Sequence, residues 1–208
     1  MAKGLLISVS GPSGTGKGSV LAKVKEMNPG FGTSISVTTR APREGEQDGV
    51  DYFFKSKEEF MKMYEEGEIL EYDEFVDNYY GTPTVALQEM SEAGTDVLLD
   101  LTIAGSMALK ENFEQSVTIF LLAPSYEELE NRLRGRGTDS DEAIKARLEM
   151  ARQETNFVGH FDYVVVNDDI EVAAKKINAI ITAEKCRCVR NVELLEDVIR
   201  INKEMEGN

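Results

Sequence analysis

The chain has 208 residues, a hydrophobic fraction of 41% and a formal net charge of −15 at pH 7. This length suits one α/β domain with room for inserted lobes, and so acidic a surface repels a nucleic-acid backbone. No apolar run reaches the length of a membrane span, and the N-terminal segment is too short and too soon interrupted for a signal peptide. A single histidine, His160, disfavours a histidine-based metal site or catalytic triad, and Cys186 and Cys188 are too close in sequence to clamp a fold. We therefore expect a cytoplasmic protein with reduced thiols that binds neither nucleic acid nor a membrane.

A glycine-rich stretch near the N-terminus, VSGPSGTGKGS at residues 9–19, almost matches the phosphate-binding pattern G-x-x-x-x-G-K-[ST]. It follows the β-branched run LLISV at residues 5–9 and precedes a helical pattern that stops before Asn28. In this setting backbone N–H groups and the helix N-terminus bind phosphate oxygens, while Lys17 neutralises charge on the β- and γ-phosphates. The alternative is a turn between strand and helix with a surface lysine, which the flanking elements disfavour.

The hydroxyl of this loop stands one residue later than the pattern requires, since Gly18 follows Lys17 and Ser19 comes next. Nucleoside monophosphate kinases commonly carry G-K-G-[ST] here, so the loop resembles theirs more than a GTPase loop. Ser19 is then the hydroxyl near the phosphates or the water shell of Mg²⁺. We expect ATP to be bound by the whole loop, which consists of Gly11, Pro12, Ser13, Gly14, Thr15, Gly16, Lys17, Gly18 and Ser19.

An inserted mixed α+β lobe is predicted at residues 33–82, where short alternating pieces and one helix near 57–66 replace the buried-strand pattern. Within it, Arg40 and Arg43 stand three apart in a proline turn, so that both guanidinium groups can converge on one phosphate. The hydroxyl of Tyr52 can join them. The lobe is therefore a candidate site for a second phosphorylated ligand.

The rest of the chain alternates strands with helices, which is typical of βαβ units and a parallel sheet. Strands are predicted at 95–101, 116–122 and 163–167, and the helices that follow them at 104–112, 125–134 and 169–184. The fold class is therefore α/β, with a parallel sheet core flanked by helices. That core is assembled from residues 1–32, 83–135 and 156–190.

Two further segments complete the prediction. Residues 136–155 are polar and helical without an apolar stripe of their own, which favours a mobile lid. Residues 191–205 form a further amphipathic helix, whose apolar face consists of Val192, Leu195, Val198 and Ile199. We expect this helix to pack on the body or on a second subunit, which would make a homodimer.

Several sequence strings in the lobe and the core occur together in a fixed order. They are SVTTRAPREGEQDGVDYFF at 36–54, ILEYDEF at 69–75, NYYGT at 78–82, LLDL, the RGRGT start of the lid, and VVND. In these strings the chain resembles the guanylate kinase family, over about residues 4–185. The resemblance implies a P-loop nucleoside monophosphate kinase that uses ATP and Mg²⁺ to phosphorylate GMP, and dGMP, to the diphosphate. Such an enzyme serves purine nucleotide metabolism and GMP recycling.

The resemblance also implies residue roles. The groups implied to hold the GMP phosphate are Arg40, Arg43, Tyr52 and Tyr80, and those implied to read guanine are Ser36, Glu71 and Thr82. Asp100 would orient the acceptor or the Mg²⁺ water shell. The groups implied to close on the phosphates as catalytic residues beside Lys17 are Arg132, Arg136 and Arg147. We expect the Arg147 charge to arrive only when the lid closes.

One physical argument supports the guanine assignment. Guanine presents adjacent N1–H and N2–H donors that one carboxylate, that of Glu71, can accept together, whereas adenine would leave this carboxylate unpaired. Taken alone, Glu71 is more typical of a solvated strand edge than of a base-reading group. Asp100 is equally typical of the end of a buried strand and of a site carboxylate. Two positions depart from the family. Thr102 stands where a second acidic residue is usual, so we include it in the GMP site as an uncharged hydrogen-bonding group, and Ala104 stands where glutamine is common.

Two other functions remain open at this point. Guanylate-kinase-like domains of scaffolding proteins bind phosphopeptides through the same lobe, but they typically have a broken phosphate loop. A related kinase acting on another phosphorylated ribose would share loop and lid and lack the guanine reader; Thr102 favours it slightly, while Glu71 and Thr82 disfavour it. A GTPase is disfavoured, because VVND at 165–168 lacks the N-K-x-D pattern that reads guanine.

Overall fold

The computed structural model describes residues 3–135, 137, 139–192, 195–196 and 198–200. Its core is a parallel sheet with the strand order β6-β1-β7-β8. These strands are β1 (Leu6–Ser10), β6 (Val97–Asp100), β7 (Val117–Leu122) and β8 (Tyr163–Val166). The α/β prediction is confirmed. The strands of the core are mostly apolar because helices cover both faces of this sheet.

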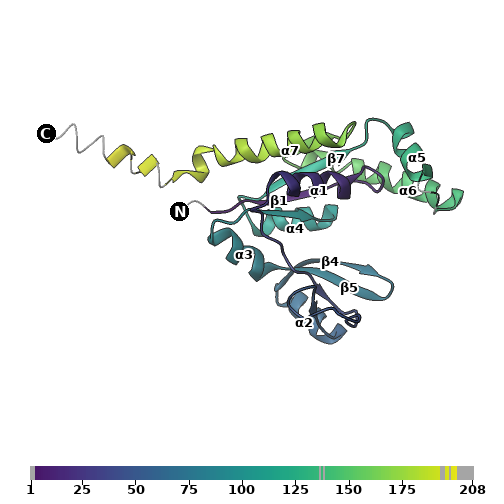
Figure 1. The fold of residues 1–208 in the computed structure, drawn as a ribbon, viewed down its shortest axis with the longest axis horizontal. Helices are drawn as coiled ribbons and strands as arrows, with labels where there is room; N and C mark the ends of the chain where they lie inside the picture. Colours follow the sequence, from purple (N-terminus) through teal and green to yellow (C-terminus); the bar gives the residue numbers. More distant parts are fainter. Residues whose placement is uncertain (1–2, 136, 138, 193–194, 197, 201–208) are drawn as a thin grey trace.

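Alternate residues of the strands enter two separate apolar clusters. Ile7 and Val9 pack with the helices α1 (Lys17–Met27) and α7 (Ile170–Lys185), whereas Leu6 packs with α3 (Thr84–Glu92) and α4 (Ile103–Asn112). Figure 1 shows α1 and α7 running together on one side of the core and α4 on the other. The carboxyl ends of the strands are thereby held at one rigid edge, where the glycine loop lies. Helix α3 was not predicted from the sequence.

A second, mixed sheet forms the inserted lobe, with the strand order β3-β2-β5-β4. Its strands are β2 (Val37–Thr38), β3 (Phe53–Phe54), β4 (Ile69–Phe75) and β5 (Asn78–Pro83), and α2 (Lys57–Glu65) packs on it through the fully buried Phe60. A capping box between Ser56 and Glu59 begins α2. The β4–β5 turn uses Val76 and Asp77 at positive φ, 48° and 58°, which a β-branched residue rarely adopts. This hairpin was not predicted as such, since β5 has no apolar alternation.

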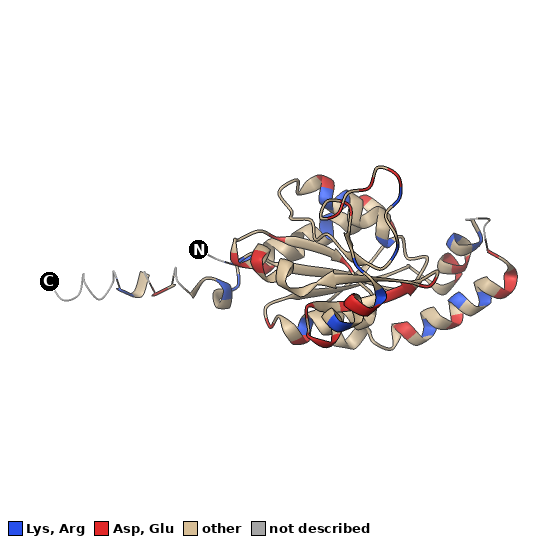
Figure 2. Ribbon diagram, turned by 90° about the horizontal axis from the view of Figure 1, so that it is seen from below, with Lys and Arg blue, Asp and Glu red and all other residues tan. Residues whose placement is uncertain are grey.

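The expectation that residues 136–155 lack an apolar stripe is wrong. Helix α6 (Asp141–Thr155) buries Ile144 and Ala151 against Leu129 and Leu133 of α5 (Tyr126–Gly135). These two helices therefore share a small core of their own, although their outer faces carry alternating acidic and basic residues (Figure 2).

The C-terminal segment begins with a 3-10 turn at Cys188–Arg190, after α7. The apolar side chains that are predicted to form one face of its helix are 41–53% exposed, and none of them is buried: Val192, Leu195, Val198 and Ile199. Packing against a second subunit stays a prediction, and residues 193–194, 197 and 201–205 of that predicted helix lie outside the described residues.

Across the part of the chain that the structure describes, no helix combines the length and apolarity needed to cross a membrane.

Candidate active site

The glycine loop connects the end of β1 to the start of α1 in a conformation that only glycine tolerates easily. Gly16 has φ 85°, and a Cβ atom there would lie 2.6 Å from Nδ2 of Asn167. Asn167 is buried behind the loop and donates a hydrogen bond from Nδ2 to the Thr15 carbonyl, at 2.7 Å. The residue that follows β8 therefore holds the loop through its backbone. The sequence analysis assigned no role to Asn167.

Lys17 is the first residue of α1, and its ammonium group lies among oxygens from the end of β6. The Nζ atom is 2.5 Å from Oδ1 of Asp100 and donates to the Leu101 carbonyl at 3.2 Å. Parallel pairing sets Asp100 beside Val9, one residue before the end of β1. Asp100 is therefore an ion-pair partner of the loop lysine as well as the end of a buried strand.

A cavity of about 470 Å³ lies over the loop. The loop lines it from Ser10 to Ser19, and the far wall includes Thr102, Ile103 and Glu154. The Thr102 hydroxyl accepts a hydrogen bond from the Gly105 N–H at 3.0 Å and so caps α4. Thr102 therefore lines this cavity, and its hydroxyl oxygen already accepts a hydrogen bond from the backbone of α4.

Two of the three predicted lid arginines contact the loop. Arg147 donates from Nη1 to the Ser13 hydroxyl at 2.9 Å and pairs with Asp139 at 3.3 Å. Arg132 donates from Nη1 to the Thr15 carbonyl at 3.4 Å. Arg147 thus reaches the glycine loop in this arrangement of α6, and the expectation that its charge arrives only on lid closure stays a prediction. Arg136 lies outside the described residues.

Glu154 is a residue of this cavity that sequence reasoning missed. It stands seven residues after Arg147 on α6, and helical spacing places both on the same face. Burial raises the pKa of its carboxyl group, and the nearby Lys17 ammonium opposes that rise. Its spacing from Arg147 was the available sequence signal.

The predicted phosphate clamp of the lobe is assembled around Arg40. Its guanidinium carbon lies 5.4 Å from the centre of the Tyr52 ring, and the Tyr52 and Tyr80 rings are 6.0 Å apart. Arg40 also donates from Nη2 to Glu46 at 2.8 Å, while Glu46 accepts the Arg43 N–H at 2.7 Å. The Arg40 side chain, followed by the Arg43 N–H, lowers the pKa of Glu46. Glu46, which was not predicted as a site residue, thus ties together the two arginine positions.

Arg43 itself lies in the exposed turn, so its guanidinium is open to an incoming anion. Ser36 immediately precedes β2, and its carbonyl accepts the Phe53 N–H at 2.9 Å. The structure thus places Ser36 and Arg40 at opposite ends of the same short strand.

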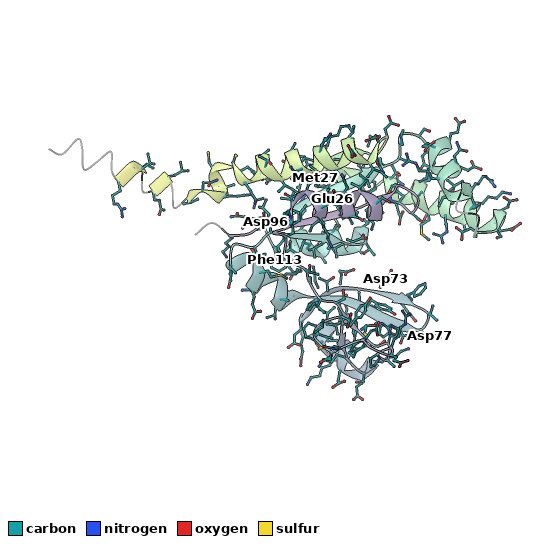
Figure 3. The ribbon with its side chains drawn as sticks, viewed as in Figure 1. Glu26, Met27, Asp73, Asp77, Asp96 and Phe113 are labelled. Carbon is teal, nitrogen blue, oxygen red and sulfur yellow. The ribbon has the colours of Figure 1, made fainter. Side chains whose placement is uncertain are left out.

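The proposed base-reading pair is formed across the β4–β5 hairpin. Thr82, 7% exposed, donates from its hydroxyl to Oε1 of Glu71 at 2.9 Å. Burial raises the pKa of Glu71, and the carboxylates of Asp73 and Asp100 add to the rise, while the Thr82 hydroxyl and Lys17 oppose it. Asp73 lies on the side of the lobe that faces the core, and Asp77 at the hairpin turn (Figure 3). Glu71 is therefore a shielded carboxylate between the lobe and α4 and not a solvated strand edge.

A glycine loop at the carboxyl edge of a parallel sheet, contacted by arginines and faced by a separate lobe, defines a P-loop nucleotide-binding protein with a second ligand site. The family model for guanylate kinase matches residues 3–184. A guanylate kinase of Halalkalibacterium halodurans is 44% identical over 199 residues, covering 96% of this chain and 98% of that protein. One of Caldanaerobacter subterraneus subsp. tengcongensis is 50% identical over 192 residues, covering 92% and 93%. The crystal structure of guanylate kinase from Anaplasma phagocytophilum superposes with a TM-score of 0.70 at 36% identity, covering 95% of this chain and 96% of that one. The chain belongs to the guanylate kinase family.

Proposed function

We propose that the protein transfers the γ-phosphoryl group of ATP to the phosphate of GMP, and more slowly of dGMP, giving ADP and the guanine nucleoside diphosphate. Family membership supports this reaction. The observation that supports it most directly is the hydrogen bond between Thr82 and Glu71, at 2.9 Å. The charges of Lys17 and Asp100, at the glycine loop, act on the pKa of the same Glu71 carboxyl group. A guanine bound there would put its nucleotide beside the donor loop.

On the donor side, the loop N–H groups and the N-terminus of α1 would bind the β- and γ-phosphates of ATP. Lys17 would exchange part of its contact with Asp100 for phosphate oxygens, since a doubly charged phosphate competes well for an ammonium group. Arg147 and Arg132 already lie on the loop, so their charges are in place to offset the charge of the phosphoryl group in transfer. We assign Arg136 to the same group from the resemblance.

On the acceptor side, Arg40, Arg43, Tyr52 and Tyr80 would hold the GMP phosphate. The hydrogen bond from Nη2 of Arg40 to Glu46 fixes the orientation of the planar guanidinium group. It leaves other N–H groups of that guanidinium free to bind the ligand. Ser36, Glu71 and Thr82 would read the base, and Thr102 would stand between the two sites. The ionised carboxylate of Glu71 accepts the two guanine donors, while adenine offers an acceptor at N1 and leaves a buried carboxylate unpaired.

The donor cavity also fits a hydrated Mg²⁺ ion. Its lining includes two hard oxygen ligands, the Ser19 hydroxyl and the Glu154 carboxylate, and the carboxylate of Asp100 lies next to it as the partner of Lys17. These residues would hold the water shell of the ion, which neutralises phosphate charge when it is bound. A phosphopeptide-binding module would need none of this, and the intact Gly11, Gly16 and Lys17 disfavour it.

We propose that residues 33–82 act as the GMP-binding unit, residues 136–155 as the lid and the remainder to residue 190 as the core. The protein would work in the cytoplasm, in purine nucleotide metabolism. It would need no nucleic-acid or membrane partner, and a homodimer would form through the exposed apolar residues of the C-terminal segment.

A coupled assay with Mg-ATP and each of GMP, dGMP, AMP, CMP and UMP tests the function. We expect GMP to react fastest, dGMP more slowly, and the other nucleotides at least about 100-fold less efficiently, as the loss of a buried polar contact implies. Equal efficiency with AMP and GMP would contradict the base assignment. No turnover with any nucleotide, while GMP still binds, would favour the binding-module alternative.

A further inference from the structure

Gly105, in the first turn of α4, lies directly against the side chain of Glu71. A Cβ atom added at Gly105 would be 2.7 Å from Cγ of Glu71, 2.8 Å from its Oε2 and 3.0 Å from its Cδ. These separations are shorter than real Cβ contacts, so a side chain at position 105 would force the carboxylate to move. Helix α4 and strand β4 are neighbours (Figure 1) and are in contact elsewhere along their length as well.

The backbone of α4 does not itself require glycine at this position. Gly105 has an ordinary helical conformation, since its φ is not in the left-handed region, and alanine is the better helix former by about 1 kcal/mol. Each of the three closest atoms to the added Cβ belongs to the Glu71 side chain. The absence of a side chain at 105 is therefore explained by Glu71 and not by the needs of the helix.

The same placement orients the carboxylate. Oε1 accepts the Thr82 hydroxyl at 2.9 Å, while Oε2 is the oxygen on the Gly105 side, beside the first turn of α4. The positive end of a helix favours an ionised carboxylate close to it. One oxygen is thus held by the hairpin, and the other faces Gly105 at the start of α4.

We propose that Gly105 is a specificity-positioning residue, which fixes the Glu71 carboxylate in the orientation that accepts the two donors of guanine. This inference rests on the proposed function and adds to it the residue that determines where the base-reading carboxylate of Glu71 lies. Thr82 holds Glu71 from the lobe, and the missing side chain at Gly105 leaves the room on the core side that this position of the carboxylate needs. The selection of guanine therefore depends on how the lobe is docked on α4.

The test is a double-mutant cycle between Gly105→Ala and Glu71→Ala, with kinetics for GMP, for IMP and for ATP. IMP keeps the N1–H of guanine and lacks the N2 amino group, so it reports on the second contact. We expect Gly105→Ala to raise the KM for GMP about 10- to 100-fold, as for one misplaced charged hydrogen bond, and to change the KM for ATP less than about threefold. The preference for GMP over IMP should fall about tenfold.

In the Glu71→Ala background, Gly105→Ala should have no further effect, because the atoms that it would displace are gone. Gly159→Ala is the matched control, since a Cβ there meets nothing within 4 Å. Additive effects of the two substitutions on the KM for GMP, or an equal rise in the KM for ATP, would overturn the inference and leave a merely structural role.

The two proposals fail differently. If Glu71→Ala leaves the KM for GMP unchanged, the base-reading assignment and this inference both fall. If Glu71→Ala weakens GMP but Gly105→Ala does not, the inference alone is wrong. If Gly105→Ala does not fold, the melting temperature of the double variant decides: recovery supports the contact with Glu71, and continued unfolding overturns it.

Discussion

Lys17 of the glycine loop and Asp100 at the end of β6 are joined by an ion pair of 2.5 Å. The two residues are 83 positions apart, and only the parallel pairing of β1 with β6 brings them together. The Lys17 side chain is 24% exposed and that of Asp100 is 53% exposed, so the pair contributes less than about 1 kcal/mol to stability. We propose that its importance is functional, because it would keep the ammonium group pointed at the cavity over the loop.

Lys17→Ala should reduce kcat by about two to four orders of magnitude, because Lys17 neutralises charge that grows during transfer. The free energy of unfolding should change by less than about 1 kcal/mol, as the exposed pair implies. Steady-state kinetics and urea denaturation measure the two effects. A variant that keeps its turnover would show that the loop lysine has no part in transfer.

Gly18→Ser restores the pattern G-x-x-x-x-G-K-[ST] and tests whether the late hydroxyl is a defect. We expect no large gain in kcat, since Ser19 already lines the cavity. The measurement is the rate of GMP phosphorylation under saturating Mg-ATP. A large increase would mean that the natural loop is impaired.

Arg43→Ala and Arg147→Ala should separate the acceptor clamp from the lid. Arg43 lies in the open turn of the lobe, so its loss should raise the KM for GMP strongly and the KM for ATP little. Arg147 contacts Ser13, so its loss should lower kcat more than it raises either KM. A charged contact in a desolvated site contributes roughly 2–4 kcal/mol, which corresponds to about 30- to 1,000-fold. If Arg147→Ala raised only the KM for GMP, Arg147 would belong to the clamp.

The pH dependence of GMP use should report on Glu71. Burial raises the pKa of this carboxyl group, so it takes up a proton at a higher pH than an exposed glutamate does. The protonated form cannot accept both guanine donors, so the KM for GMP should rise as pH falls from neutrality through the raised pKa. Glu71→Gln should bind GMP weakly and lose this pH dependence. Profiles of KM from about pH 5 to pH 8 for both proteins decide the matter; parallel profiles would assign the titration to another group.

The same proton uptake by Glu71 should also change the free energy of unfolding over that interval. Between the ordinary and the raised pKa of Glu71, the folded protein binds more protons than the unfolded chain, so its free energy of unfolding falls as pH rises. Glu71→Gln should remove this slope, which urea titrations at several pH values can measure.

The buried cluster at the end of α7 should control stability and not catalysis. Glu184 is 4% exposed and accepts hydrogen bonds from the Tyr163 hydroxyl at 2.5 Å and from Nη2 of Arg190 at 2.7 Å. Burial alone would raise the pKa of Glu184, but these hydrogen bonds and one from Arg187 outweigh it and lower the pKa. Its contribution is thus present above the unfolded pKa and is lost as pH falls through the folded value.

Arg190→Met leaves this carboxylate buried without its main partner and should lower the free energy of unfolding by about 3–5 kcal/mol at neutral pH. The KM values for GMP and for ATP should stay within about threefold, because none of these residues lines the cavity over the glycine loop. Urea denaturation is the measurement, with Arg187→Met as the milder control. A loss below about 1 kcal/mol would show that the cluster adds little.

Local pattern alone determined the parallel core, the glycine loop with Lys17, and the Arg40–Arg43 turn. Buried strands and a strand–loop–helix unit repeat at short range along the chain, so periodicity and glycine spacing reveal them. Periodicity missed the apolar face of α6, which consists of Ile144, Leu148 and Ala151 at helical spacing. The charged residues between them lower the mean hydropathy of the segment and so obscure the pattern. It also missed β5, whose residues do not alternate between apolar and polar.

Only the tertiary structure decided which residues position the site. Glu46 orients Arg40, Asn167 holds the loop from behind, Glu154 faces the donor cavity, and Gly105 limits Glu71. Each of these relationships, apart from the turn around Glu46, joins elements far apart in sequence. Their geometry comes from how the lobe packs on α4, α6 on α5 and the end of β8 against the loop, and contacts set by packing over such separations leave no periodic signal in a single sequence.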